Sequence, residues 1–102
     1  MEPSDLGRFS DPAVLILASL AGGEKHGYAM MEDIRATSGV HLGPGTLYGA
    51  ISRLEADGLI EALQTVERRR PYRITPSGVA FLRAYLASLQ RFVSLGNARL
   101  EI

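Results

Sequence analysis

A long apolar seam near the end of the chain constrains the fold more than any other feature. Its positions are separated alternately by three and four residues, the spacing of a helix face that packs along another helix. They are Val79, Leu82, Leu86, Leu89, Val93, Gly96 and Leu100. A helix of about 27 residues would be roughly 40 Å long. Because a chain of 102 residues is too small to cover it, we expect a second subunit there.

Helix start signals precede the seam. Asp11 can cap free backbone N–H groups, and Pro12 suits a first helical turn. Thr75 and Pro76 repeat this pair of signals just before the seam. A further helix is predicted at about 26–38, with His26 capping or orienting its start. We expect its inward residues to be Tyr28, Met31 and Ile34, with Met30 as a further candidate.

The hydrophobic period changes at Leu59, after a third predicted helix that starts near Gly43 and ends at Gly58. Alternation over 59–64 and again over 71–75 predicts a β-hairpin with a charged tip. A short extended piece is predicted at 40–42. The fold class is therefore mainly α with a small β-hairpin, a winged helix-turn-helix domain (1–75) followed by a dimerisation helix (76–102).

Composition excludes several classes of function. The chain has no cysteine, which rules out disulfides, thiol catalysis and Cys-ligated zinc. Neither histidine lies in a metal or acid–base motif, and no nucleophile motif is present, so we expect no enzyme, metal or cofactor. The longest apolar run, Ala13–Leu17, is too short to span a bilayer. These features predict a soluble, cytoplasmic protein.

Net charge is zero, whereas nucleic-acid-binding domains are often basic. The charges are nevertheless polarised. Within 66–75 there are four arginines, Arg68, Arg69, Arg70 and Arg73, and a single acid, Glu67. At a hairpin tip the first three suit the minor groove, where negative potential attracts arginine. The alternative is that these three arginines only form a solvated loop. Arg73 could bind phosphate or pair with an acid such as Glu61.

Four motifs together resemble a known family. They are His26-Gly27-Tyr28, Gly45-Thr46-Leu47-Tyr48, Arg53-Leu54-Glu55-Ala56-Asp57-Gly58-Leu59-Ile60 and Tyr72-Arg73-Ile74-Thr75-Pro76-Ser77-Gly78. In this order and spacing, over roughly 14–82, they resemble the PadR family of bacterial transcriptional regulators. The resemblance implies a homodimeric repressor with a recognition helix after Gly45, a basic wing, and the single C-terminal helix of the family's short branch. Some members of that branch bind flat aromatic compounds between subunits, with tryptophans stacking on them. This chain has no tryptophan.

The third helix carries the predicted DNA-reading surface. Leu47, Ile51 and Leu54 form its apolar face. The outward positions are then Thr46, Gly49, Ala50 and Arg53, with Tyr48 at the margin. Thr46 can bind a phosphate or a base edge, and Arg53 can reach a guanine. The small residues would let the helix sit close in the major groove. Tyr48 could bind phosphate or pack half-buried, and an ordinary surface helix is the alternative.

The last helix carries two further expectations. The dimerisation residues are Val79, Leu82, Leu86, Leu89, Val93 and Leu100. Phe81, Tyr85 and Phe92 could line an apolar pocket for a small aromatic effector. The expected function is repression by a homodimer on double-stranded DNA with a pseudo-palindromic operator, relieved by such an effector. The alternative is a winged-helix module that binds proteins, favoured by zero net charge and by Glu55 and Asp57 on the third helix.

Overall fold

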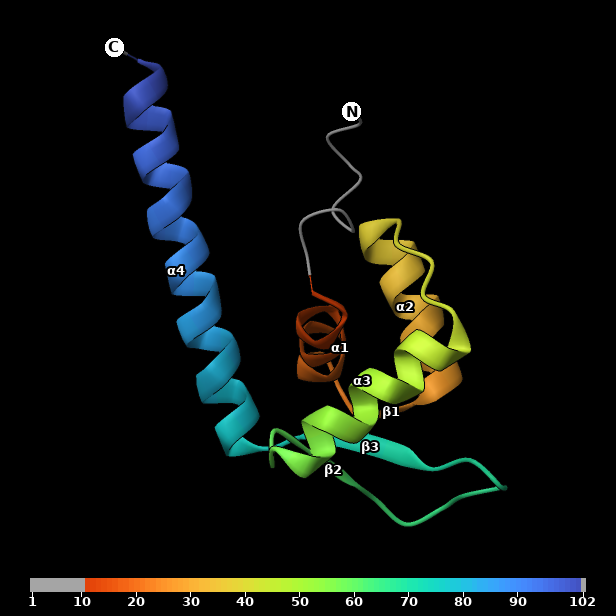
Figure 1. Ribbon diagram of the computed structural model, residues 1–102. Coiled ribbons are helices and arrows are strands. Elements are labelled where there is room, and N and C mark those ends of the chain that lie inside the picture. The colour runs from red at the N-terminus through yellow and green to blue at the C-terminus, as the bar shows by residue number, and fades with distance from the viewer. Residues whose placement is uncertain (1–10, 102) are drawn as a thin grey trace.

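The computed structural model describes residues 11–101. The first ten residues and Ile102, which belong to the expected ranges 1–75 and 76–102, lie outside the described part. The elements are α1 (Pro12–Ala21), β1 (Lys25–His26), α2 (Gly27–Ser38), α3 (Pro44–Ala56), β2 (Ile60–Ala62), β3 (Pro71–Ile74) and α4 (Pro76–Leu100). Helices α1–α3 group together, the β2–β3 hairpin extends beneath them, and α4 projects along one side (Figure 1). The expected winged helix-turn-helix class is confirmed.

Capping side chains explain where the helices begin. The Asp11 carboxylate accepts a hydrogen bond from the backbone N–H of Ala13 at 2.7 Å, and Pro12 follows as the first residue of α1. Thr75 Oγ1 accepts from the N–H of Gly78 at 3.1 Å at the start of α4. The starts predicted at these positions are confirmed, because a cap and a proline satisfy or remove backbone donors that have no partner within the helix.

The sheet has three antiparallel strands in the order β1-β3-β2. The hairpin was predicted, but β1 was not, because two residues carry no hydrophobic period. The predicted extended piece at 40–42 forms no strand, and its Leu42 is buried in the core instead. At the wing tip Val66 and Arg69 exchange backbone hydrogen bonds of 2.8 and 2.9 Å. The intervening residues Glu67 and Arg68 have φ of 50° and 67°, as a two-residue type I′ turn requires.

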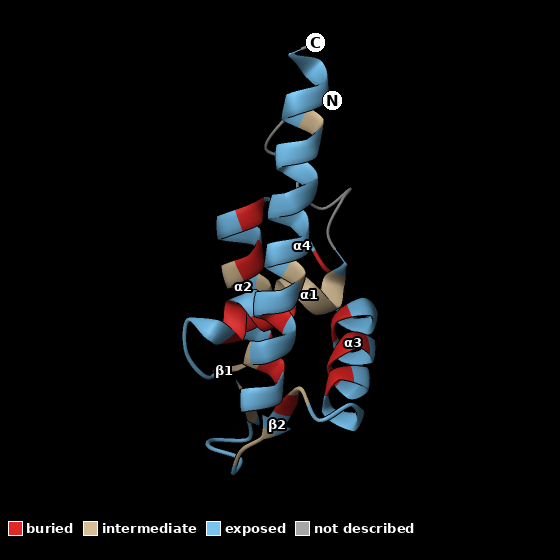
Figure 2. Ribbon diagram, turned by 90° about the vertical axis from the view of Figure 1, so that its left-hand side faces the viewer, coloured by how far each residue is buried: buried red, intermediate tan, exposed pale blue. Residues whose placement is uncertain are grey.

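The core lies between α1, α2, α3 and the sheet, and Figure 2 shows that most of α4 takes no part in it. Three expectations are corrected. Ala50 is 1% exposed, so it packs inside rather than on the outer face of α3. Leu82 is 7% exposed, so it belongs to the core of this chain and has little surface left for a second subunit. Tyr28 was expected to face inward but is 57% exposed, and Met30 takes the inward place at 0%.

Within residues 11–101, no helix is both long enough and apolar enough to cross a membrane.

Candidate nucleic-acid interface

Helix α3 has an exposed face made of small residues. Its buried residues are Leu47, Ala50, Ile51 and Leu54. At 3.6 residues per turn, the positions opposite that set are Gly45, Gly49, Ser52 and Ala56, all of them exposed. Thr46 and Arg53 lie on one flank of this face, and Tyr48 and Glu55 lie on the other. The sequence reasoning missed Ser52 because it left Ala50 out of the apolar set. Counting alanine as apolar would have rotated the predicted face onto Ser52.

Within residues 11–101, the two glycines of that face have no packing role. A Cβ added to Gly45 or Gly49 would meet no heavy atom within 4 Å. Glycine inside a helix costs about 1 kcal/mol relative to alanine, so Gly49 weakens α3 without any gain within the described fold. A surface with no side chain at two positions and small side chains at the other two allows close approach of another molecule.

Tyr48 packs on the start of α2. A Cβ on Gly27 would overlap the Tyr48 hydroxyl and lie 2.8 Å from its Cζ, so Gly27 leaves the space that the ring fills. The Tyr48 side chain is still 49% exposed. The half-buried packing considered for Tyr48 is therefore present, while a phosphate contact stays a prediction.

A hollow of about 250 Å³ separates the wing from α2 and α3. Its side chains are His26, Tyr28, Tyr48, Tyr72 and the three wing arginines, Arg68, Arg69 and Arg70. Burial raises the pKa of the Tyr72 phenol, and the Glu55 carboxylate raises it further, while Arg70 acts in the opposite direction. The Tyr72 hydroxyl thus keeps its proton near neutral pH and can donate. Phenol and guanidinium donors gathered in one hollow suit an anion.

The wing arginines differ in their contacts. Arg69 Nη1 lies 3.1 Å from His26 Nε2, and Arg70 Nη1 donates to the Leu63 carbonyl at 3.1 Å. On β3, Arg73 Nε donates to Glu61 Oε1 at 2.6 Å, across the β2–β3 pair in which these two residues are in register. Of the two roles considered for Arg73, the structure therefore has the ion pair.

Arg53 lies near the other end of α3, at a second hollow of about 260 Å³ between α1, α3 and α4. Phe81 and Tyr85 line it too, so two of the residues expected at an effector pocket meet there. Phe92 is not among its lining residues and is 71% exposed. Asp11 and Asp57 add carboxylates to this hollow.

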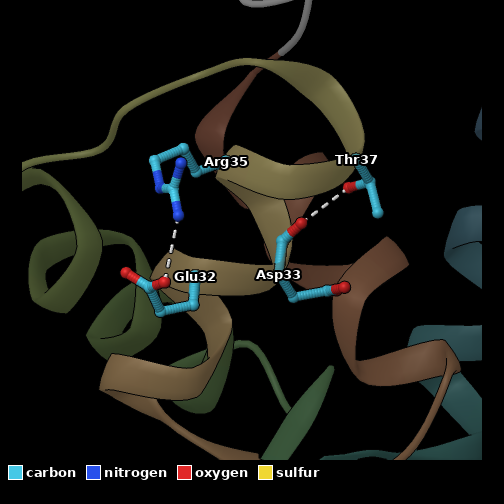
Figure 3. Close-up of polar contacts among 4 residues, drawn as sticks. All are labelled: Glu32, Asp33, Arg35 and Thr37. Atoms are coloured by element: carbon cyan, nitrogen blue, oxygen red, sulfur yellow. Dashed lines mark hydrogen bonds and ion pairs between the residues drawn. The ribbon is translucent and has the colours of Figure 1, made fainter.

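The acids of α2 make structural contacts. In Figure 3, Glu32 Oε2 accepts from Arg35 Nη2 at 3.1 Å, and the Thr37 hydroxyl donates to the Asp33 carbonyl at 2.8 Å. The Asp33 carboxylate accepts from the buried Ser19 hydroxyl at 2.6 Å and so ties α2 to α1. Among residues 11–101, no group of three His, Cys, Asp or Glu side chains is arranged to hold a metal.

The chain is similar to known proteins in both sequence and fold. The family model described as transcriptional regulator PadR-like family matches residues 16–84. A transcriptional regulator of Mycobacterium tuberculosis is 40% identical over 89 residues, which cover 81% of this chain and 82% of that protein. A 37.1 kDa protein in a transposon of Streptomyces fradiae is 44% identical over 84 residues, covering 82% of this chain but only 24% of the relative. A crystal structure of a PadR family transcription regulator from Clostridium difficile, 26% identical, superposes with a TM-score of 0.80 and covers 89% of this chain and 99% of that one.

Proposed function

Because the chain belongs to the PadR-like family of transcriptional regulators, we propose that it binds duplex DNA as a homodimer and represses transcription from a pseudo-palindromic operator. The observation that carries the proposal is the exposed face of α3, where Gly45 and Gly49 leave open space beside a wing with three arginines. A bare helix face next to a basic hairpin fits a major groove and the neighbouring backbone.

The DNA contacts follow from the position of each side chain. With α3 in the major groove, Ser52 faces the base edges, while Thr46 and Arg53 reach bases or phosphates from one flank. Arg68 lies in the turn at the wing tip, where it extends along the backbone or into the minor groove. Gly49 lets the helix axis approach the bases. In this arrangement Ala50 supports the helix from inside and makes no contact with DNA.

Dimerisation would use the outer part of α4. The helix has 25 residues, roughly 38 Å at 1.5 Å per residue, and its apolar face continues beyond the body as Leu86, Leu89, Val93 and Leu100. These side chains are 43% to 86% exposed, an unusual state for leucine and valine in one stripe. Val79 is half-buried and Leu82 is buried, so the proposed seam begins at Leu86. Two α3 helices held about 34–36 Å apart would match successive major grooves.

An effector would act at the hollow that Phe81 and Tyr85 share with α1 and α3. A planar apolar compound bound there would change the angle between α4 and α3, and therefore the spacing of the two recognition helices. Titration with planar aromatic compounds should then lower DNA affinity. Unchanged affinity across such a series would contradict this part of the proposal.

The proposed function is tested by binding of the purified protein to duplex DNA from its own promoter. The control is a shuffled duplex of the same length and composition, and both are measured at two salt concentrations. We expect tighter binding to the promoter and weaker binding to both duplexes at higher salt, since phosphate contacts release counterions. Equal and negligible binding to both would contradict an operator in this promoter, and would favour the alternative of a protein-binding module.

A further inference from the structure

Arg69 has two contacts with the body of the domain. Its Nη1 atom lies 3.1 Å from His26 Nε2, and its Cζ lies 6.0 Å from the centroid of the Tyr28 ring. These partners stand at the start of α2, far from Arg69 in the sequence. The contacts therefore fix a wing side chain relative to the helical body.

Both ring nitrogens of His26 face donors. The backbone N–H of Ala29 points to Nδ1 at 3.3 Å, and the Arg69 guanidinium points to Nε2 at 3.1 Å. A neutral imidazole accepts at only one nitrogen, because the other carries the proton. A hydrogen bond from a charged donor is shorter and stronger than one from a neutral donor. The contact with Arg69 therefore takes precedence, which puts the proton on Nδ1. A protonated Nδ1 cannot accept from the N–H of Ala29, so the His26 side chain then no longer caps α2.

This conflict explains why a histidine stands at the start of α2. As a cap alone, asparagine, aspartate or serine would serve better, and none of them presents a second acceptor that reaches the wing. The imidazole ring spans the gap between the helix start and Arg69.

We propose that His26 positions Arg69 for a DNA phosphate: in the Nδ1–H tautomer it holds one N–H of the guanidinium and leaves the others available at the hollow between the wing, α2 and α3, which Arg69 lines. This inference rests on the proposed function. A guanidinium has five N–H donors, and His26 engages one of them. Among the residues that the structure describes, no side chain lining the hollow is acidic. The phenol groups of Tyr28, Tyr48 and Tyr72 add donors for the same phosphate.

The tautomer is tested by NMR of the ring nitrogens. The chain has two histidines, so His41→Asn leaves His26 as the only source of ring signals. Near pH 8, where an ordinary histidine is neutral, we expect the ¹⁵N shifts of an unprotonated Nε2. In the His41→Asn/Arg69→Gln double variant the proton should move to Nε2, because Nδ1 is then free to cap α2. An Nε2–H tautomer in both proteins would overturn the proposal.

Positioning is tested by a double-mutant cycle on binding to the promoter duplex. His26→Asn keeps a side-chain oxygen that can cap α2, and thermal unfolding confirms that it folds. We expect His26→Asn and Arg69→Gln each to weaken binding by about three- to tenfold, and the double variant to bind no more weakly than Arg69→Gln. His41→Asn, the same change at the other histidine, should bind as the unmodified protein does.

The outcomes separate the two claims. If the single losses add in the double variant while DNA binding itself is intact, His26 does not act through Arg69 and the inference is overturned alone. If the unmodified protein binds neither duplex at any salt concentration, the proposed function fails and the phosphate contact fails with it. A tautomer shift on removing Arg69 together with non-additive losses supports the inference.

Discussion

At the scale of single residues, Gly49 distinguishes a DNA-reading helix from an ordinary surface helix. Since nothing lies within 4 Å of its Cβ position, we expect Gly49→Ala to raise the free energy of unfolding by about 0.5–1 kcal/mol. The same methyl group would hold α3 away from the groove and weaken promoter binding by about tenfold, the effect of one lost base contact. Urea unfolding and fluorescence anisotropy measure the two effects.

Gly22→Ala is the matched control. Gly22 has an ordinary φ of −81° at the end of α1, and its new Cβ would meet the Ser19 carbonyl at an acceptable 3.4 Å. We expect unchanged promoter binding there. A Gly49→Ala variant that gains stability and binds DNA normally would show that the bare face of α3 does not meet DNA.

Gly27 shows the opposite case, a glycine required by a neighbouring side chain. In Gly27→Ala the new methyl group overlaps the Tyr48 ring, so we expect a loss of about 1–3 kcal/mol in the free energy of unfolding. In the Tyr48→Ala background the ring is gone and Gly27→Ala should cost much less. Equal costs in both backgrounds, measured by urea unfolding, would contradict this account of the contact.

At the scale of elements, local chemistry made the helix boundaries predictable from sequence. Asp11 and Thr75 act as caps in the structure as their spacing predicted, because a cap and the N–H it satisfies lie within three residues of each other. The rotation of α3 and the inward residues of α2 depend on tertiary packing. That dependence is why Ala50 and Tyr28 were assigned to the wrong side.

The cap at Thr75 also joins two elements. Its hydroxyl accepts from the N–H of Gly78 at 3.1 Å and donates to the Gly58 carbonyl at 2.7 Å, so it ties the start of α4 to the end of α3. We expect Thr75→Ala to lower the free energy of unfolding by about 1–2 kcal/mol, since both bonds are lost. Thr75→Ser keeps the hydroxyl and should lose far less. Thermal unfolding compares the two variants. Equal losses of stability would contradict a stabilising role for the Thr75 hydroxyl.

At the scale of the whole molecule, the candidate interface is assembled from distant segments. The start of α2, the middle of α3 and the wing tip meet at one hollow, although the sequence separates His26 from Arg69 by 43 positions. Sequence patterns identified the wing arginines and the recognition helix as separate candidates. They could not pair Arg69 with His26 or place Arg53 at a different hollow, because those neighbours depend on how the sheet packs against the helices.

The proposed dimer also depends on the shape of the whole molecule. The molecule measures 56 × 28 × 20 Å, since α4 extends beyond the core that covers its first turns (Figure 2). Leu89 lies on the helix face that continues from buried Leu82, whereas Gln90 lies about 100° around the helix. We expect Leu89→Glu to give monomers in sedimentation velocity and to lose high-affinity promoter binding, because a charge cannot be buried unpaired in the seam. Gln90→Glu adds the same charge one residue away and should stay dimeric. If Leu89→Glu also sediments as a dimer, two copies associate through another surface, and the spacing of their α3 helices cannot be set by α4.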